Sequence, residues 1–160
     1  MRKRYYLAYG SNLNISQMRY RCPSARVVGT AVIENYQLLF KGSKTGSYLT
    51  IEPCEGDSVP VAAWEVAEDD ERRLDRYEGF PHFYYKKELR LPITGIKSGK
   101  VRMRDAFVYI MHEERSCGVP SMSYLRTCDI GYLNFGFDPC KLAKAFEVSL
   151  KLMGGYVNEN

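Results

Sequence analysis

Short apolar runs of strand length dominate the first two thirds of the chain. Residues 5–9 form the first run, and residues 27–40 predict one long bent strand or two short ones, with Gly29 at a β-bulge. Residues 41–47 are rich in glycine and predict a turn. The pattern therefore begins as β-structure.

Two pairs of strands are predicted further along the chain. Residues 48–52 and 59–68 are expected to pair across a loop at residues 53–58. Residues 83–91 and 101–112 predict a second hairpin, because each run carries the alternating and β-branched or aromatic residues typical of strands.

Helical spacing interrupts this series. Ile15 and Met18 lie on one face of a predicted helix that Asn12 or Asn14 caps and that ends before Pro23. A second helix is expected to begin at Asp69 or Asp70 and to end at Gly79, and a third begins at Pro120 and Ser121 around Tyr124 and Leu125.

The last helix is predicted to begin at Asp138, with Pro139 at its first position. Its apolar face repeats Leu142, Phe146, Leu150 and Met153. Strands thus outnumber helices, and the two do not alternate strictly. This order favours an α+β fold, with a curled mixed sheet or small barrel and peripheral helices, in one domain over residues 1–160.

Composition changes this picture little. Apolar residues make up 45% and charged residues 26% of the 160 residues, as in an ordinary soluble protein. Met1 to Arg4 are basic, but Gly10 ends the apolar stretch too early for a signal peptide, so we expect a cytoplasmic protein. The net charge of +4 is dispersed, which is more typical of solvated surface than of a nucleic-acid interface.

Five cysteines and two histidines give little support for metal or disulfide chemistry. No CxxC pair occurs among the cysteines, and only His82 and His112 could assist a zinc site. The cysteines are interpreted as buried or idle reduced thiols, and neither a metal nor a cofactor is expected.

The segment Gly10-Ser11-Asn12 follows the first strand and precedes a helix. Unpaired N–H groups at such a junction can bind a carboxylate, or an amide oxygen that becomes negative. The segment could equally be a capped turn without a ligand. A nucleophilic role for Ser11 has less support, because the flanking residues lack the GxSxG pattern.

Glu78 lies at the predicted end of the second helix, beside Tyr77, Phe80 and Phe83. The negative end of the helix dipole and poor hydration both disfavour a charged carboxylate, so we expect a raised pKa there. Such a group can accept a proton near neutral pH. The alternative is a surface glutamate at a helix end.

Thirteen tyrosines form the chain's compositional peculiarity, and several of them lie near these segments. Tyr84 and Tyr85 are on one predicted strand, so only one of them can face a given pocket. Tyr109 and Tyr124 are on other elements. Taken singly, each is more typical of a core than of a catalytic site.

Several motifs occur in one order over nearly the whole chain. They are Tyr9-Gly10-Ser11-Asn12-Leu13, Cys22-Pro23-Ser24-Ala25, Leu74-Asp75-x-Tyr77-Glu78-Gly79, Tyr109, Pro120-Ser121-x-x-Tyr124, and glycines 131 and 136. With these motifs the chain resembles the gamma-glutamylcyclotransferase-like proteins, including the plant avirulence-induced relatives.

The resemblance implies a small mixed β-barrel flanked by short helices, with the loop and the glutamate facing one cavity. It implies that Glu78 is the catalytic acid–base, that Tyr9, Gly10, Ser11, Asn12 and Leu13 bind substrate, and that Tyr85, Tyr109 and Tyr124 border the pocket. An ungapped count selects Tyr85, and one gap would select Tyr84. The implied reaction converts a gamma-glutamyl substrate to 5-oxoproline and a free amine without a cofactor.

Two other functions stay open at this point. One is a non-catalytic module that binds a gamma-glutamyl or other small anionic metabolite in the same cavity. The other is a nucleic-acid-associated protein, suggested by residues 2–4, Arg19, Arg21 and residues 97–104, although these basic clusters match no known motif. We expect a monomer with a small-molecule gamma-glutamyl substrate and no nucleic-acid or membrane partner. The leaving amine is not defined by the sequence.

Overall fold

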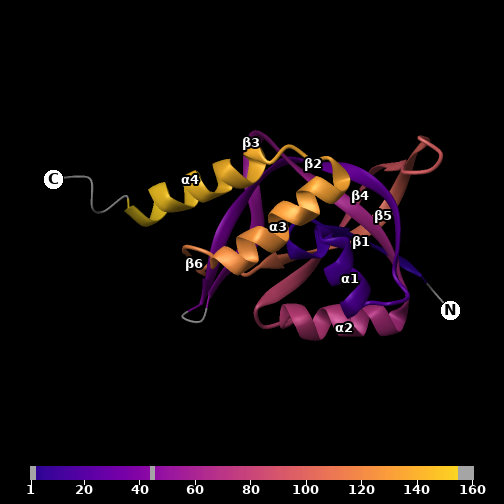
Figure 1. The fold of residues 1–160 in the computed structure, drawn as a ribbon, viewed down its shortest axis with the longest axis horizontal. Coiled ribbons are helices and arrows are strands. Elements are labelled where there is room, and N and C mark those ends of the chain that lie inside the picture. The colour runs from indigo at the N-terminus through magenta and orange to yellow at the C-terminus, as the bar shows by residue number, and fades with distance from the viewer. Residues whose placement is uncertain (1–2, 44–45, 155–160) are drawn as a thin grey trace.

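The computed structural model describes residues 3–43 and 46–154. In these residues five strands close into a mixed barrel, in the order β3-β1-β5-β4-β2 with β2 pairing back to β3 (Figure 1). Only β1 and β5 pair in parallel among them. The strands are β1 (Arg4–Ala8), β2 (Arg26–Ser43), β3 (Gly46–Val66), β4 (Tyr84–Gly95) and β5 (Val101–Met111).

Short elements complete the described chain. A two-residue strand, β6 (Ser116–Cys117), pairs with the end of β2. The helices are η1 (Ser11–Leu13), α1 (Ile15–Arg21), α2 (Glu68–Glu78), α3 (Met122–Phe135) and α4 (Cys140–Gly154). This architecture confirms the predicted α+β class with a small barrel and peripheral helices. None of the helices described is long and apolar enough to cross a membrane.

The long hairpin of β2 and β3 differs from the prediction. Residues 46–66 form one strand, so the predicted pair 48–52 and 59–68 is wrong. The predicted loop 53–58 is an irregularity inside β3, opposite Asn35, which has a φ of 62°. Both halves of β3 pair with β2 instead of with each other. The turn predicted at residues 41–47 includes residues 44–45, which lie outside the described part.

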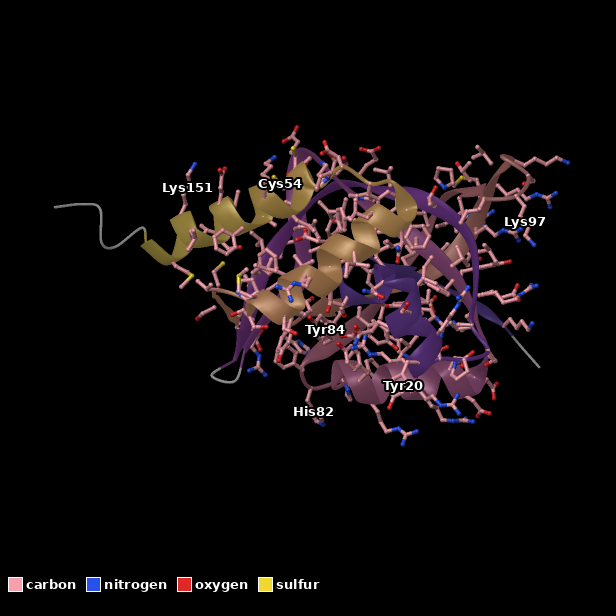
Figure 2. All side chains as sticks on the ribbon, viewed as in Figure 1. Tyr20, Cys54, His82, Tyr84, Lys97 and Lys151 are labelled. Atoms are coloured by element: carbon pink, nitrogen blue, oxygen red, sulfur yellow. The ribbon has the colours of Figure 1, made fainter. Side chains whose placement is uncertain are left out.

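Gly29 lies where β2 pairs with β4. The register of β2 shifts between Val27 and Gly29, which confirms the predicted bulge. Gly29 pairs with Gly95 of β4, and a Cβ on Gly29 would lie 2.3 Å from the Thr94 carbonyl oxygen. Only a glycine permits this close approach of the two strands. The β4–β5 hairpin then extends beyond the barrel, with Lys97 at its turn (Figure 2).

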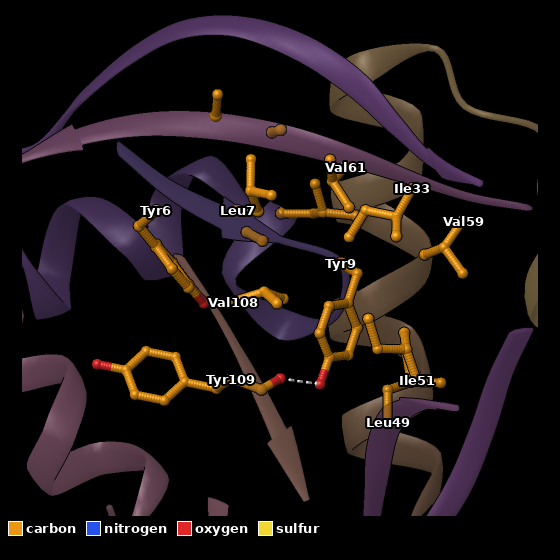
Figure 3. Packing of buried hydrophobic residues seen from close by; sticks show 14 of the residues in the cluster. Tyr6, Leu7, Tyr9, Ile33, Leu49, Ile51, Val59, Val61, Val108 and Tyr109 are labelled. Atoms are coloured by element: carbon orange, nitrogen blue, oxygen red, sulfur yellow. Dashed lines mark hydrogen bonds between the residues drawn. The ribbon is translucent and has the colours of Figure 1, made fainter. Parts of the chain in front are cut away.

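The barrel interior is filled by apolar side chains from every strand. Leu7, Ile51, Val61 and Val108 are fully buried there, and Tyr9 and Tyr109 lie at the edge of the same cluster (Figure 3). Burying apolar surface of this kind stabilises the fold by about 25 cal/mol per Å². The site described below is therefore built on the rim of a rigid core.

The helices begin and end largely where their capping residues predict. Asn14 caps α1, since its side chain accepts a hydrogen bond from the Gln17 N–H at 3.1 Å. Gly79 ends α2 in the left-handed conformation, with φ 65°. Ser121 caps α3. Asp70, predicted as a cap, lies instead at the third position of α2 and accepts a bond from the Ala67 N–H.

Helix α4 is only partly packed on the barrel. Leu142 is buried, but Leu150 and Met153 are both 42% exposed, so only the first half of the predicted apolar face is covered. The Ser149 hydroxyl accepts a hydrogen bond from the Phe40 N–H at 2.9 Å, which fixes the helix against β2. The last turn of α4, beyond Ser149, extends away from the barrel (Figure 1).

Candidate active site

A cavity of about 410 Å³ lies at one end of the barrel. Its walls come from the loop after β1, from β3, from the end of α2, and from β4, β5 and α3. Segments far apart in the sequence thus converge on one space. The lining residues are Tyr6, Tyr9, Gly10, Ser11, Asn12, Tyr48, Leu49, Arg76, Tyr77, Glu78, Gly79, Phe83, Tyr84, Tyr109 and Tyr124.

The loop wall is shaped by the tight turn after β1. Residues 11–13 form the 3-10 helix η1, whose first bond runs from the Leu13 N–H to the Gly10 carbonyl at 3.0 Å. The N–H groups of Ser11 and Asn12 precede that bond and so have no partner within the helix. A Cβ on Gly10 would lie 3.2 Å from the Tyr124 hydroxyl, so glycine lets the loop approach α3 closely.

Glu78 is the last residue of α2, directly before the left-handed Gly79. Its side chain is partly buried and lines the cavity beside Tyr77. No hydrogen bond or ion pair to its carboxylate occurs in the described part of the chain. Burial raises the pKa of Glu78 to about 8, and the nearby Arg21 guanidinium opposes that rise.

The tyrosines around Glu78 remain protonated. Burial raises the pKa of Tyr6, Tyr9, Tyr84 and Tyr124 well above their ordinary value of 10.0. Their hydroxyls therefore stay neutral and can donate hydrogen bonds at physiological pH. Glu78, by contrast, has a pKa that lets it both accept and release a proton near neutrality.

Each predicted site residue can now be placed. Glu78, Tyr9, Gly10, Ser11, Asn12, Tyr109 and Tyr124 all line the cavity, as expected from the resemblance. Leu13 and Tyr85 are not among the lining residues, and of the two alternatives on β4 it is Tyr84 that lines the cavity.

Leu13 is fully buried, and its backbone and Cβ lie against α3 at Gly131, so it packs in the core behind the loop. Tyr85 lies on the opposite face of β4 from the cavity, because successive strand residues alternate. Its hydroxyl bonds to Glu113 Oε2 at 2.5 Å. Tyr84 lines the cavity instead, and its hydroxyl donates to the Leu49 carbonyl at 2.8 Å.

Several lining residues were not predicted from the sequence as site residues. They are Tyr6, Tyr48, Leu49, Arg76, Tyr77, Gly79 and Phe83. Tyr77 could have been found by its place beside Glu78, and Tyr6 by its place in the strand that leads to the loop. Tyr48 and Leu49 follow a segment that carries no motif.

Tyr109 links the cavity to an ion-pair cluster outside it. Its hydroxyl donates to Asp75 Oδ1 at 2.6 Å, and Lys86 Nζ lies 2.8 Å from the same oxygen. Lys86 also pairs with Glu71 Oε2 at 2.6 Å. Since Asp75 and Glu71 belong to α2 and Lys86 to β4, this cluster fixes the helix that carries Glu78 against the barrel.

The cavity contains no cluster of metal ligands. In residues 3–43 and 46–154, no group of three or more His, Cys, Asp or Glu side chains could hold a metal ion. The arrangement offers a proton acceptor, neutral hydroxyl donors and free loop amides. Chemically, it suits proton transfer on a small polar molecule with an anionic or carbonyl group.

Comparison with known proteins identifies the family. Residues 6–126 match the family model described as "Gamma-glutamyl cyclotransferase, AIG2-like". The chain belongs to this family. The matched segment includes residues 6–8 of β1, the loop, Glu78 and Tyr124, so every lining residue of the cavity lies within it.

Individual relatives agree with this family. A bovine protein named gamma-glutamylcyclotransferase is 35% identical over 81 residues, which are 46% of this chain and 43% of that protein. The matched part thus spans less than half of the bovine relative.

Solved structures share the fold. A structure titled gamma-glutamyl cyclotransferase has a TM-score of 0.71 at 24% identity, covering 95% of this chain and 87% of its own. An uncharacterised human protein gives a TM-score of 0.71 at 24% identity, covering 96% and 88%.

Proposed function

We propose that this protein is a gamma-glutamylcyclotransferase, which releases 5-oxoproline and a free amine or amino acid from a gamma-glutamyl substrate. The observation that carries the proposal is the position of Glu78. Its carboxylate has a pKa of about 8 and lines the same cavity as the loop amides. Family membership supports the reaction class but leaves its substrate open.

The reaction needs only groups that the substrate and this cavity supply. The α-amine nitrogen attacks the γ-carbonyl carbon, which forms the ring C–N bond and places negative charge on the carbonyl oxygen. That intermediate collapses as the bond from the same carbon to the leaving nitrogen breaks. Because the attack is intramolecular, the protein chiefly has to hold the substrate in a folded conformation.

Glu78 moves the proton in this scheme. Its carboxylate takes a proton from the α-ammonium, which frees the nitrogen lone pair for attack. That proton then passes to the leaving nitrogen. The second proton, which the ring nitrogen loses after the attack, follows the same route, so the amine leaves as its ammonium ion and no net proton is gained or lost by the enzyme. A pKa near 8 suits both steps, because a carboxyl with an ordinary pKa near 4.5 would be a poor acid at neutral pH.

The loop would bind the charged oxygens of the substrate. N–H groups of Ser11 and Asn12 can hold the α-carboxylate or the oxyanion, as free donors at the start of a helical turn do. Tyrosines from three other elements surround the same space. Tyr124 can orient the substrate, because its hydroxyl accepts from the Leu49 N–H at 3.0 Å and keeps its own proton to donate, whereas the hydroxyls of Tyr84 and Tyr109 already donate within the protein.

The test is an assay of 5-oxoproline release over a panel of gamma-glutamyl compounds. The panel contains a gamma-glutamyl amino acid, glutathione, gamma-glutamyl-ε-lysine and a gamma-glutamyl alkylamine, each with wild type and Glu78→Gln. Turnover of at least one compound by wild type, abolished in the variant, is expected.

A silent panel would reject the enzyme. If calorimetry then showed that the same compounds bind, the cavity would be a binding site for a gamma-glutamyl metabolite. The carboxylate in the cavity argues against that alternative, since a site built only to bind an anion would not place a negative group inside it.

A further inference from the structure

Arg21 contacts two walls of the cavity, the loop after β1 and the end of α2, although it is not itself a lining residue. It is the last residue of α1, and its Nη1 donates to Asn12 Oδ1 and, at 3.4 Å, to Ser11 Oγ. Its guanidinium carbon lies 3.4 Å from the centroid of the Tyr77 ring. Arg21 therefore contacts both the loop and the last turn of α2.

These contacts continue into the cavity. Asn12 Nδ2 donates to the Tyr6 hydroxyl at 3.0 Å, and Ser11 Oγ lies 3.3 Å from the Tyr77 hydroxyl. Arg21, Ser11 and Tyr77 thus form a closed ring of contacts. Each residue that Arg21 touches lines the cavity, although Arg21 itself stands behind this wall.

The geometry requires a guanidinium. A planar guanidinium can lie flat on an aromatic ring while its edge donates hydrogen bonds. A lysine ammonium could supply the charge, but it could not stack on Tyr77 and bond to the loop in the same way. The two properties of Arg21, shape and charge, can therefore be separated by substitution.

The charge of Arg21 acts beside the carboxylate of Glu78. Glu78 is the one acidic side chain among the lining residues of the described cavity. The groups that face it from other elements are neutral tyrosines: Tyr6 and Tyr9 near β1, Tyr84 on β4, Tyr109 on β5 and Tyr124 on α3. On α2 itself are Tyr77, Arg76 at the cavity wall, and Asp75, which is paired with Lys86.

We propose that Arg21 is a positioning residue of the reaction, which holds the loop 10–13 and the last turn of α2 together around Glu78. This inference rests on the proposed function. Arg21 acts in two ways: it fixes Asn12 and Tyr77, which shape the substrate site, and it supplies the positive charge that keeps part of Glu78 ionised at neutral pH. Without it, Glu78 remains protonated over a wider pH range and the base is lost.

The experiment compares Arg21→Met, Arg21→Lys and Arg19→Met. Arg19 is exposed on the same helix and serves as the matched control. The pH profile of kcat/KM is measured for each, with circular dichroism and thermal unfolding as checks of the fold. Arg21→Met is expected to shift the acidic limb to higher pH by about one unit, which lowers the rate at pH 7 about tenfold.

Arg21→Lys separates charge from shape. It is expected to keep the position of the acidic limb but to raise KM, because the ring of contacts to Asn12 and Tyr77 is lost. Arg19→Met is expected to behave as wild type. An unchanged pH profile and KM in folded Arg21→Met and Arg21→Lys would overturn the proposal.

A titration distinguishes this proposal from the proposed function. The pKa of Glu78 is measured by carbon-13 NMR of its carboxyl group, assigned by comparison with Glu78→Gln. A higher pKa in Arg21→Met supports the role of Arg21 even if no compound of the panel is turned over. Equal values in wild type and in Arg21→Met would overturn the electrostatic role, whatever the activity.

Discussion

The two ends of helix α2 surround a carboxylate with different groups. Near the beginning, Asp70 is fully buried but accepts hydrogen bonds from the Ser24 hydroxyl at 2.9 and 2.8 Å and from the Ala67 N–H at 3.2 Å. At the other end, Glu78 is partly buried and has no bonded partner within the described residues. The first end also benefits from the helix dipole, and the second opposes it.

One helix therefore carries a carboxylate that contributes to the fold, Asp70, and a carboxylate that is a candidate for catalysis, Glu78. A buried carboxylate with well-placed donors contributes to the fold through its hydrogen bonds, whereas desolvation disfavours the charged form of one without them. The burial of Glu78 raises its pKa to about 8 for that reason. Groups with strongly shifted pKa values and free space beside them are candidates for catalysis.

The largest effect is expected from Glu78→Gln. Glutamine fills the same space but cannot accept the proton, so turnover should fall by at least about 100-fold, a typical share for a general base. The measurement is kcat for 5-oxoproline release on the best substrate, with the unfolding curve as control. A variant with near-normal turnover would show that another group moves the proton.

Asp70→Ala tests the other end of the helix. Removal of a buried acceptor of several hydrogen bonds should lower the free energy of unfolding by about 2 kcal/mol, because the Ser24 and Ala67 donors lose their partner. The folded fraction should keep its turnover. Asp69→Ala is the control, since that side chain is 71% exposed, and denaturant titration compares the three proteins. Equal loss in both variants would contradict the assignment.

The free energy of unfolding should depend on pH through the carboxyl group of Glu78. The pKa of Glu78 is raised from 4.5 in the unfolded chain to about 8 in the fold, so the folded state binds the proton more tightly. This contribution is fully present below pH 4.5 and is lost as pH rises through about 8, by up to about 1.4 kcal/mol per pH unit.

The comparison that isolates this effect is wild type minus Glu78→Gln. Denaturant titrations of both proteins at several pH values between 5 and 9 provide it, since other groups contribute equally to both. Parallel stability curves would mean that Glu78 titrates alike in the folded and unfolded states.

The smallest effects concern the neighbouring tyrosines of β4. Tyr84→Phe removes a buried bond to the Leu49 carbonyl and should lower stability by about 1 kcal/mol and alter KM. Tyr85→Phe removes an exposed bond to Glu113 and should change stability by less than about 0.5 kcal/mol and leave KM unchanged. The opposite ranking would show that Tyr85 faces the substrate.

Local signals in the sequence predicted much of this molecule. Gly79 after a capped helical pattern placed Glu78 at a helix end, and the glycine-containing loop after an apolar run placed residues 10–12 at a strand-to-helix junction. These features depend on neighbouring residues only. The barrel itself was predicted from the strand-rich order of elements and from the resemblance together.

Other features depend on contacts that a linear pattern does not record. The choice between Tyr84 and Tyr85 depends on strand register, and a shift of one residue exchanges the two faces. The continuity of β3 depends on its pairing with β2, which overrides the prolines at positions 53 and 60. Arg21 was considered only as part of a basic cluster, because its contact with Tyr77 on another helix cannot be read from its neighbours in the sequence.

The place of β1 in the barrel has a consequence for biosynthesis. β1 lies between β3 and β5, and its Tyr6 is paired with Phe107, so β1 leaves the ribosome before its partner strand β5 has been synthesised. Such distant pairing slows the search for the native state. A nascent chain stalled before β5 should therefore lack both the closed barrel and the cavity wall that Tyr109 provides.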